Sequence, residues 1–361
     1  MRICFIGPSR SSHLIKICNW FILNGDEVHV ISFDDNKIAG CLLHYLNIDV
    51  NPKGTDCSKI KYLFSGKKLK NIVKQIQPDI ISVHYASSYG TAIAFSGMKH
   101  YILSVWGSDI YEFPTKSIFH KKILGYSLKK AEYLFSTSKV MAKEASKYTD
   151  KSFVITPFGV NMNLFTPNLR NRDSSKFVIG TIKALSKTYG IDILLRAVAL
   201  FKRRHKNCRL EVRIAGIGPE DSTLRRLARE LEIEDSIVWL GFITQEVAAY
   251  EWANMDVGVI PSNAESFGVS AIECESCGVP VVVSDAPGLM ESTYPGKTSI
   301  VFHRGDVNGC FEAISTFYLD KNLRKKYGNS GREYVKQNFD FNENMKTFRK
   351  YLSNIANRNQ K

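Results

Sequence analysis

Two glutamates, Glu265 and Glu273, are separated by seven residues in the segment NAESFGVSAIECESCGVPVVVSD. The run after Phe267 predicts a helix that ends at Gly278, and the continuously apolar residues that follow predict a buried parallel strand. The first turn of such a helix carries free N–H groups that favour a phosphate. A carboxylate beside a phosphate is repelled unless it binds hydroxyl groups. The pattern therefore predicts a ligand that is part phosphate and part polyol, although carboxylates near a helix start could also complement the helix dipole.

Further candidate residues stand where predicted strands lead into loops. Lys183 and Lys187, in GTIKALSKTYG, would place two cations beside a diphosphate. Gly216 and Gly218, in AGIGPED, would let a backbone or a ligand come close. Gly7, in GPSRSSH, could serve a ligand or only a tight turn. Because this last segment lacks the G-x-G-x-x-G pattern, a nicotinamide dinucleotide is not favoured.

These residues need elements that bring them together. Strands such as RICFIG and DIISVHY alternate with helical segments in the first half, and FVIGTI and VPVVVSD do so in the second. This alternation predicts an α/β protein with a parallel sheet formed twice. The polar segment NMNLFTPNLRNRDSSK interrupts it. We predict two Rossmann-like domains, over residues 1–160 and 172–335, with ligands in a cleft outside the carboxyl ends of the strands.

The bulk properties exclude several classes of protein. A chain of 361 residues is long enough for two domains, and no apolar run approaches the ~20 residues that span a bilayer. We predict that MRICFIGPSR is a first strand rather than a secretory signal, and that the chain is cytoplasmic. The eight cysteines show no disulfide framework, which fits reduced thiols. Cys274 and Cys277 form a lone C-x-x-C without a second pair, so we expect no zinc site.

The net charge of +14 calls for an explanation. Residues 57–78 contain six lysines and no acid. In the second basic segment, lysines alternate with the apolar residues Phe119, Ile123, Leu124 and Leu128; the lysines are Lys116, Lys121, Lys122, Lys129 and Lys130. Such mixing fits an anionic membrane surface, and equally a solvated helix over the core. Nucleic acid is not expected because no zinc-finger, RRM or KH signature accompanies the charge.

The motifs together resemble glycosyltransferase family 4, whose members carry two glutamates seven residues apart in this context. The resemblance covers most of the second domain and rests on PFGVNMNLFTP, GTIKALSKTYGIDILLRA, AGIGPEDSTLRRL, WLGFI, YEWANMDVGVIPS and PSNAESFGVSAIECESCGVPVVVSD. The first domain is similar more loosely, through PDIISVHYASSYG and WGSDI. The resemblance implies a GT-B fold, with a terminal segment, 336–361, that crosses back to the first domain. It also implies a UDP- or GDP-sugar donor held mainly by the second domain, retention of anomeric configuration, no metal, and a role in bacterial cell-surface polysaccharide synthesis.

The family motif also implies roles for individual residues. Glu273 would bind the ribose hydroxyls of the donor and Glu265 the hydroxyls of the transferred sugar. Lys183 and Lys187 would neutralise the diphosphate, although the family often has Arg and Lys five residues apart rather than two lysines four apart. Backbone N–H groups would contact sugar or phosphate along the donor-binding segment, which comprises Ser266, Phe267, Gly268 and Val269. Gly7, Gly216 and Gly218 complete the predicted donor-binding set.

One position departs from the family pattern. Many relatives have a histidine where SVWGSDI places Trp106, which cannot exchange protons but can stack on a sugar or a lipid. His84, at the end of a predicted strand, is then the remaining candidate for a catalytic histidine, although a structural role is equally open. Asp109 is a second candidate on the acceptor side.

The activity that the resemblance implies is transfer of a sugar to a glycan or lipid-linked acceptor. No protein nucleophile is evident, so the leaving diphosphate would be stabilised by cations and helix N–H groups and could take the acceptor's proton. Two alternatives stay open: a nucleotide-sugar epimerase of the same fold, and a non-catalytic nucleotide-sugar-binding protein.

Overall fold

The computed structural model describes residues 1–48, 65–169, 173 and 175–359, and the chain divides into two units. The first unit comprises Met1–Phe158 and Asn342–Lys361, and the second comprises Gly159–Phe341. Gly159 and Val160, which we predicted to end the first domain, group with the second unit, where the Val160 N–H donates to the carbonyl of Phe339 at 2.8 Å. Each unit is described by itself.

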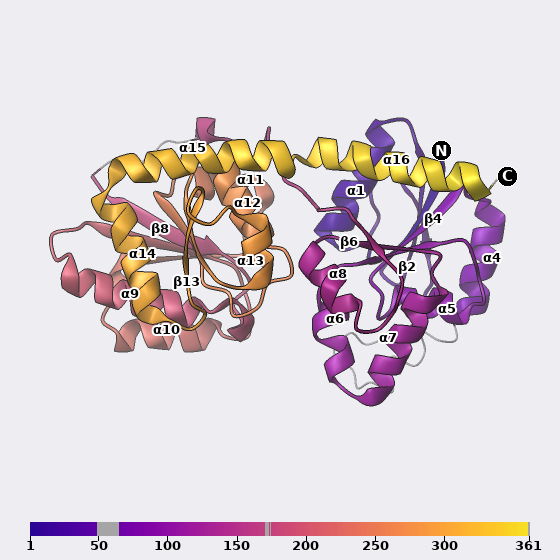
Figure 1. Ribbon diagram of the computed structural model, residues 1–361, viewed down its shortest axis with the longest axis horizontal. Coiled ribbons are helices and arrows are strands. Elements are labelled where there is room, and N and C mark those ends of the chain that lie inside the picture. The colour runs from indigo at the N-terminus through magenta and orange to yellow at the C-terminus, as the bar shows by residue number, and fades with distance from the viewer. Residues whose placement is uncertain (49–64, 170–172, 174, 360–361) are drawn as a thin grey trace. The chain divides into compact units, whose positions relative to one another are not determined.

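The described strands of the first unit form a seven-stranded parallel sheet in the order β3-β2-β1-β4-β5-β6-β7 (Figure 1). They are β1 (Arg2–Ile6), β2 (Glu27–Ser32), β3 (Leu42–Tyr45), β4 (Ile80–His84), β5 (Ile102–Val105), β6 (Tyr133–Ser136) and β7 (Phe153–Ile155). The connecting helices are α1 (Ser12–Leu23), α4 (Gly66–Ile76), α5 (Tyr89–Phe95), α6 (Ser108–Tyr111), α7 (Ile118–Lys130) and α8 (Lys139–Ala145). The central strands are buried along their length, which explains their continuously apolar sequences.

The described strands of the second unit form a six-stranded parallel sheet in the order β10-β9-β8-β11-β12-β13. They are β8 (Phe177–Ile182), β9 (Leu210–Ala215), β10 (Ile237–Gly241), β11 (Val257–Ile260), β12 (Val281–Ser284) and β13 (Ser299–Phe302). The helices are α9 (Ile191–Arg204), α10 (Asp221–Glu230), α11 (Gln245–Ala253), α12 (Val269–Ser276), α13 (Pro287–Ser292), α14 (Val307–Leu319) and α15 (Lys321–Asn338). The two sheets confirm the predicted α/β class.

The order of strands reverses once in each sheet. In the first unit the chain proceeds outward from β1 in one direction and from β4 in the other, and in the second unit it does so from β8 and from β11. At such a switch point the loops at the carboxyl ends of the two central strands diverge and leave room for a ligand. The topology therefore predicts that ligands bind at the loops after β1 and β4, and at those after β8 and β11.

The terminal helix α16 (Phe341–Asn359) packs against the first unit (Figure 1). The Arg349 guanidinium donates to both carboxylate oxygens of Asp26 at 2.8 and 2.9 Å. The Phe348 ring contacts those of Phe21 and Phe135, with centroids 5.9 and 5.8 Å apart. The preceding helix, α15, ends at Asn338, so the segment predicted to begin at 336 starts within α15. None of the described helices combines the length and apolar character that crossing a bilayer requires.

Candidate functional site

Lys183 and Glu265 meet at the switch point of the second sheet. Lys183 follows β8 and Glu265 follows β11, and the ammonium lies 2.5 Å from the Glu265 carboxylate. The two side chains are only 9% and 8% exposed, so each charge depends on the other because an isolated buried charge is costly. The Ser262 hydroxyl donates to the same carboxylate oxygen at 3.3 Å. The predicted cation for a diphosphate and the predicted carboxylate for a sugar are therefore in direct contact.

The segment between Glu265 and α12 presents backbone rather than side chains. Phe267 is 2% exposed, and its ring packs edge-on against Phe339, with centroids 5.2 Å apart, so only its backbone N–H could serve a ligand. Gly268 caps α12 with φ of 100°, and a Cβ there would lie 2.6 Å from the Ser292 hydroxyl. Glycine is thus required where the chain turns into the helix. Val269 begins α12, whose first N–H groups have no partner within the helix.

Glu273 lies further along α12 and is largely buried. The first turn of α12 contains no acidic residue, and Glu265 precedes the Gly268 cap. Neither glutamate therefore occupies the position from which a carboxylate stabilises a helix dipole. This removes the simplest structural explanation for the pair.

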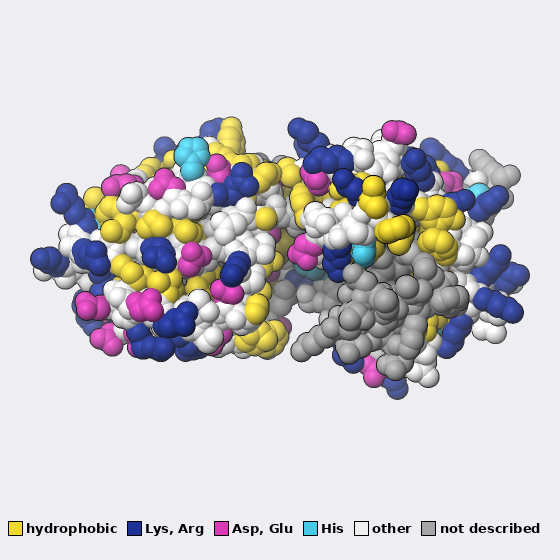
Figure 2. Space-filling model, turned by 90° about the horizontal axis from the view of Figure 1, so that it is seen from below, with side chains coloured by type: hydrophobic (Ala, Val, Ile, Leu, Met, Phe, Trp, Pro, Cys, Tyr) yellow, Lys and Arg dark blue, Asp and Glu magenta, His cyan; other side chains and the backbone are white. Residues whose placement is uncertain are grey.

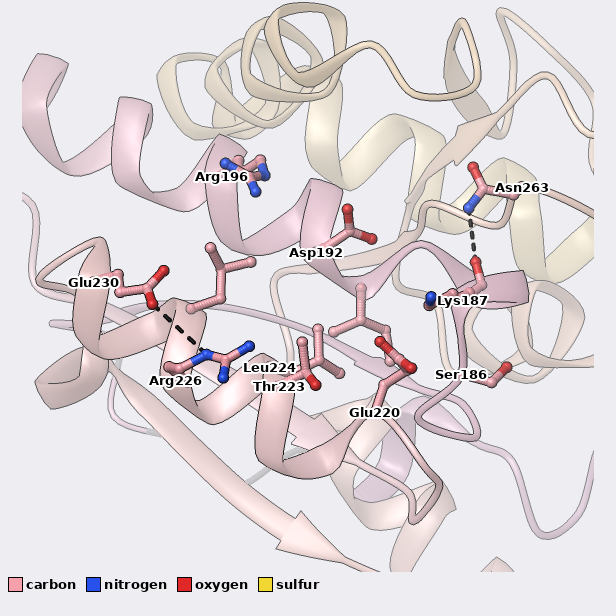
Figure 3. Close-up of a pocket in the computed structure, with 12 residues that line it drawn as sticks. Ser186, Lys187, Asp192, Arg196, Glu220, Thr223, Leu224, Arg226, Glu230 and Asn263 are labelled. Carbon is pink, nitrogen blue, oxygen red and sulfur yellow. Dashed lines mark hydrogen bonds and ion pairs between the residues drawn. The ribbon is translucent and has the colours of Figure 1, made fainter.

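Lys187 lies on the same loop as Lys183 but points elsewhere. It is exposed and lines a pocket of about 660 Å³ between α9 and α10 (Figure 3). The other predicted residues do not line this pocket. The Asn263 side chain donates to the Lys187 carbonyl at 2.7 Å, and the Asn263 backbone N–H donates to the Thr188 carbonyl at 2.8 Å. Asn263 therefore holds the loops after β8 and β11 together, a role that the sequence did not indicate.

Gly216 and Gly218 have a packing role. A Cβ on Gly216, where φ is 138°, would lie 1.8 Å from the carbonyl oxygen of Lys183. A Cβ on Gly218 would lie 2.2 Å from that of Leu185. Of the two alternatives that we predicted, a backbone or a ligand close to these glycines, protein backbone is what the structure shows, so the loop after β9 supports the loop that carries Lys183. Contact between their backbone and a donor stays a prediction.

In the first unit, His84 is buried at the switch point rather than open to a substrate. It is 1% exposed, and its ring lies 5.0 Å from Trp106 and 5.5 Å from Phe5 between centroids. Burial lowers the pKa of His84 to about 3, so the imidazole is neutral and a poor base near neutral pH. A Cβ on Gly7 would lie 3.2 Å from the Cβ of His84, which explains the glycine. The geometry fits the structural alternative, in which His84 packs against Gly7 and Trp106, and a catalytic role stays a prediction.

Asp109, the second candidate on the acceptor side, lies in the interior of the first unit. Its side chain is fully buried, and its carboxylate accepts hydrogen bonds from the backbone N–H groups of Ala86 (2.8 Å), Gly107 (2.8 Å) and Trp106 (3.1 Å). Burial raises the pKa of Asp109, against the effect of these donors. Asp109 joins the loops after β4 and β5 and so positions Trp106, and its contact with an acceptor stays a prediction.

Trp106 belongs to an aromatic cluster that sequence reasoning did not identify. The His13 and Phe158 rings are stacked, with centroids 3.9 Å apart and planes at 7°. Trp106 lies 5.5 Å from Phe158 and 6.1 Å from His13. Burial lowers the pKa of His13 to about 4, which keeps the ring neutral. All three residues are partly exposed, so the cluster offers apolar ring faces to a sugar or a lipid. The one sequence signal was the place of His13, just after the first predicted strand.

Two models of protein families match the chain. Residues 166–334 match glycosyl transferases group 1, and residues 2–138 match the glycosyl transferase 4-like family. The chain belongs to the family 4 glycosyltransferases. The resemblance seen in the sequence is thereby confirmed, and it extends to both units of this glycosyltransferase.

Individual relatives are distant. The chain is 30% identical over 198 residues to a D-inositol 3-phosphate glycosyltransferase of Pseudarthrobacter chlorophenolicus, covering 51% of this chain and 47% of that one. The match thus spans about half of that relative's length. Sucrose-phosphate synthase from Thermosynechococcus elongatus has a TM-score of 0.83, 18% identity and coverage of 98% and 99%. Anabaena HepE in complex with UDP-glucose has a TM-score of 0.77, 18% identity and coverage of 98% and 100%. These structures confirm the GT-B fold.

Among the described residues of this glycosyltransferase, no group of three or more His, Cys, Asp or Glu side chains is placed to hold a metal ion. Of the predicted residues, Lys183 and Glu265 are brought together, as one ion pair in the second unit. Metal-independent transfer stays a prediction, as does the contribution of each residue to donor binding.

Proposed function

We propose that this chain transfers a sugar from a nucleotide-sugar donor to a glycan or lipid-linked acceptor, with retention of anomeric configuration and without a bound metal. The observation that carries the proposal is the buried Lys183–Glu265 pair beside the N-terminus of α12. This arrangement offers a cation and backbone N–H groups to a diphosphate, and carboxylate oxygens to hydroxyl groups. Those are the two halves of a nucleotide sugar.

Each residue has a distinct part in the proposed reaction. Glu265 binds hydroxyls of the transferred sugar and Glu273 binds those of the ribose. Lys183 and the first N–H groups of α12 stabilise the diphosphate as the bond from the anomeric carbon to its oxygen breaks. The acceptor oxygen bonds to that carbon on the same face, and its proton passes to the leaving diphosphate. A charge-assisted hydrogen bond contributes about 1.5–3 kcal/mol, so Glu273 and Lys183 dominate donor affinity.

The donor is a UDP- or GDP-sugar in this proposal. The Anabaena structure of the same fold holds UDP-glucose, which makes that donor the first to test. The acceptor side is the cluster of Trp106, Phe158 and His13, whose ring faces suit the apolar face of a pyranose. We infer that the product is a cell-surface polysaccharide or its lipid-linked precursor.

The test begins with donor binding. Calorimetry with UDP-glucose, GDP-mannose and ADP-glucose is expected to select one base, and Glu273→Ala to weaken that binding. Glu312→Ala, which removes an exposed carboxylate on α14, is the matched control and leaves binding unchanged. Absence of binding by every nucleotide sugar would refute the proposal.

Turnover then separates the alternatives. The protein is incubated with the donor that it binds and with a set of glycan and lipid-linked acceptors. NMR then compares the anomeric configuration of the linkage in the product, α or β, with that of the donor. An isomerised sugar formed from donor alone would indicate an epimerase. Binding with neither transfer nor isomerisation would indicate a non-catalytic binding protein.

A further inference from the structure

Helix α7 of the first unit exposes apolar side chains among unpaired lysines. Ile118 and Phe119 begin the helix and are 66% and 71% exposed. Tyr126 lies on the same side two turns later, and the exposed Phe95 of α5 packs against it with ring centroids 4.9 Å apart. We call the exposed residues Phe95, Ile118, Phe119, Lys122, Tyr126, Lys129 and Lys130 the α7 patch.

The first turn of α7 is held firmly although its side chains are exposed. The Ser117 hydroxyl caps the helix by accepting from the His120 backbone N–H. The His120 ring packs edge-on against Phe113, with centroids 4.8 Å apart. Leu124 and Leu128, on the opposite side of the helix, are fully buried. Ile118 and Phe119 are thus presented outward by a helix that is anchored in the core, rather than by a loose loop.

The charge of the patch has one sign. The sequence has no acidic residue between Glu112 and Glu132. Within the described residues, Lys121, Lys122, Lys129 and Lys130 form no ion pair, and the Lys130 ammonium instead lies 5.3 Å from the centroid of the Tyr126 ring. The face of the second unit drawn in Figure 2 differs, because Lys and Arg side chains alternate there with Asp and Glu. On α10, for example, Arg225 pairs with Asp221 and Arg226 with Glu230.

We propose that the α7 patch docks this chain on an anionic lipid membrane, with Ile118 and Phe119 entering the boundary between headgroups and acyl chains and the lysines contacting the headgroups. Exposed lysines alone would suit any polyanion. Adjacent Ile and Phe side chains at the helix start favour a lipid surface over nucleic acid, because they lose contact with water only in an apolar layer. In the other basic segment, Lys59 and Lys61 lie outside the described residues, and Lys68 of α4 donates to the Leu46 carbonyl at 2.7 Å.

Flotation of the full chain with vesicles tests the proposal without reference to catalysis. Vesicles containing phosphatidylglycerol are expected to bind the protein, and pure phosphatidylcholine vesicles are not. Each unit of positive charge removed lowers binding about five-fold at low salt. Each Lys→Glu change removes two such units, so Lys122→Glu with Lys129→Glu lowers binding about 600-fold. Ile118→Ala with Phe119→Ala lowers binding at least about 100-fold at any salt.

Two control variants match these changes in chemistry. Lys325→Glu with Lys326→Glu reverses two exposed lysines of α15, and Leu23→Ala truncates a side chain of α1 that is 86% exposed. Both controls are expected to bind as the unaltered chain does, and unchanged far-UV circular dichroism shows that every variant is folded. The proposal would be overturned if the α15 control lost as much binding as the α7 lysine variant, or if the unaltered chain failed to bind anionic vesicles. Binding of duplex DNA or RNA in preference to vesicles would assign the patch to nucleic acid instead.

Discussion

Glu275 makes the stability of the second unit depend on pH. This residue of α12 is fully buried, and neither carboxyl oxygen has a hydrogen-bond partner of ordinary geometry among the described residues. Burial raises the pKa of Glu275 from 4.5 to about 8, and only the nearby Thr298 hydroxyl acts in the opposite direction. The carboxyl group is therefore protonated at neutral pH in the folded chain and ionised in the unfolded chain.

The sign and size of the effect follow from the two pKa values. The folded state holds a proton that the unfolded state releases above its pKa of 4.5, so stability is lost as pH rises toward about 8. The slope is about 1.4 kcal/mol per pH unit, which is roughly 3 kcal/mol between pH 5 and pH 7. Glu275→Gln removes this slope because an amide does not ionise. Its buried N–H₂ group costs about 1–3 kcal/mol at every pH, which lowers stability most visibly at pH 5.

Urea unfolding at a series of pH values measures this slope. A chain of two units need not unfold in one step. The measurements are therefore made in a protein that also carries Trp20→Phe and Trp106→Phe. Its remaining tryptophans, Trp239 and Trp252, report on the second unit alone. Glu230→Gln, on the exposed face of α10, is the matched control and keeps the slope. If Glu275→Gln lost stability with pH as steeply as the unaltered protein, the assignment of the proton to Glu275 would be wrong.

Four further outcomes are expected. Lys183→Ala and Glu265→Ala each leave a buried charge unpaired and destabilise the second unit by about 3–5 kcal/mol in urea unfolding. The double variant loses less free energy of unfolding than the sum of the two single losses. Glu273→Ala raises the Michaelis constant for the donor, and normal kinetics would contradict its assignment to the ribose. Gly216→Ala places a Cβ against the Lys183 carbonyl and costs about 2–4 kcal/mol of stability. Activity survives EDTA because Lys183 supplies positive charge to the diphosphate, and loss that Mg²⁺ or Mn²⁺ restores would show a metal requirement.

The fold was predictable because its signals are local. The strand β12 is buried throughout, and its run of valines has no polar alternation to suggest a one-sided sheet. The helix predicted to end at Gly278 ends at Ser276, and Gly278 adopts the positive φ of 71° expected of a residue that terminates a helix. The spacing of hydrophobic residues and the positions of glycines can be read from short segments. They therefore predict strands and helix ends without knowledge of distant parts of the chain.

Burial of polar residues was not predictable in the same way. Asp109 and His84 both follow strands and both have side chains that could meet a substrate. Asp109 instead accepts from three backbone N–H groups, one of which, that of Ala86, lies on the loop after another strand. His84 is covered by Trp106 and Phe5. Such contacts arise from strand order, which residue types and local spacing do not encode.

The Lys183–Glu265 pair shows how strand order creates a property that neither motif contains. The two residues are 82 positions apart, and they meet because β8 and β11 are neighbours at the point where the sheet reverses direction. Each residue was assigned to a different half of the donor, the diphosphate and the sugar, yet in the structure each neutralises the other. A donor that draws Lys183 toward its diphosphate must also provide hydroxyls for Glu265, since otherwise a buried carboxylate is left without a partner. A nucleoside diphosphate without a sugar satisfies only one half of this arrangement. In the proposed reaction, the pair would therefore favour the complete nucleotide sugar over the diphosphate product, and this preference would assist product release after transfer.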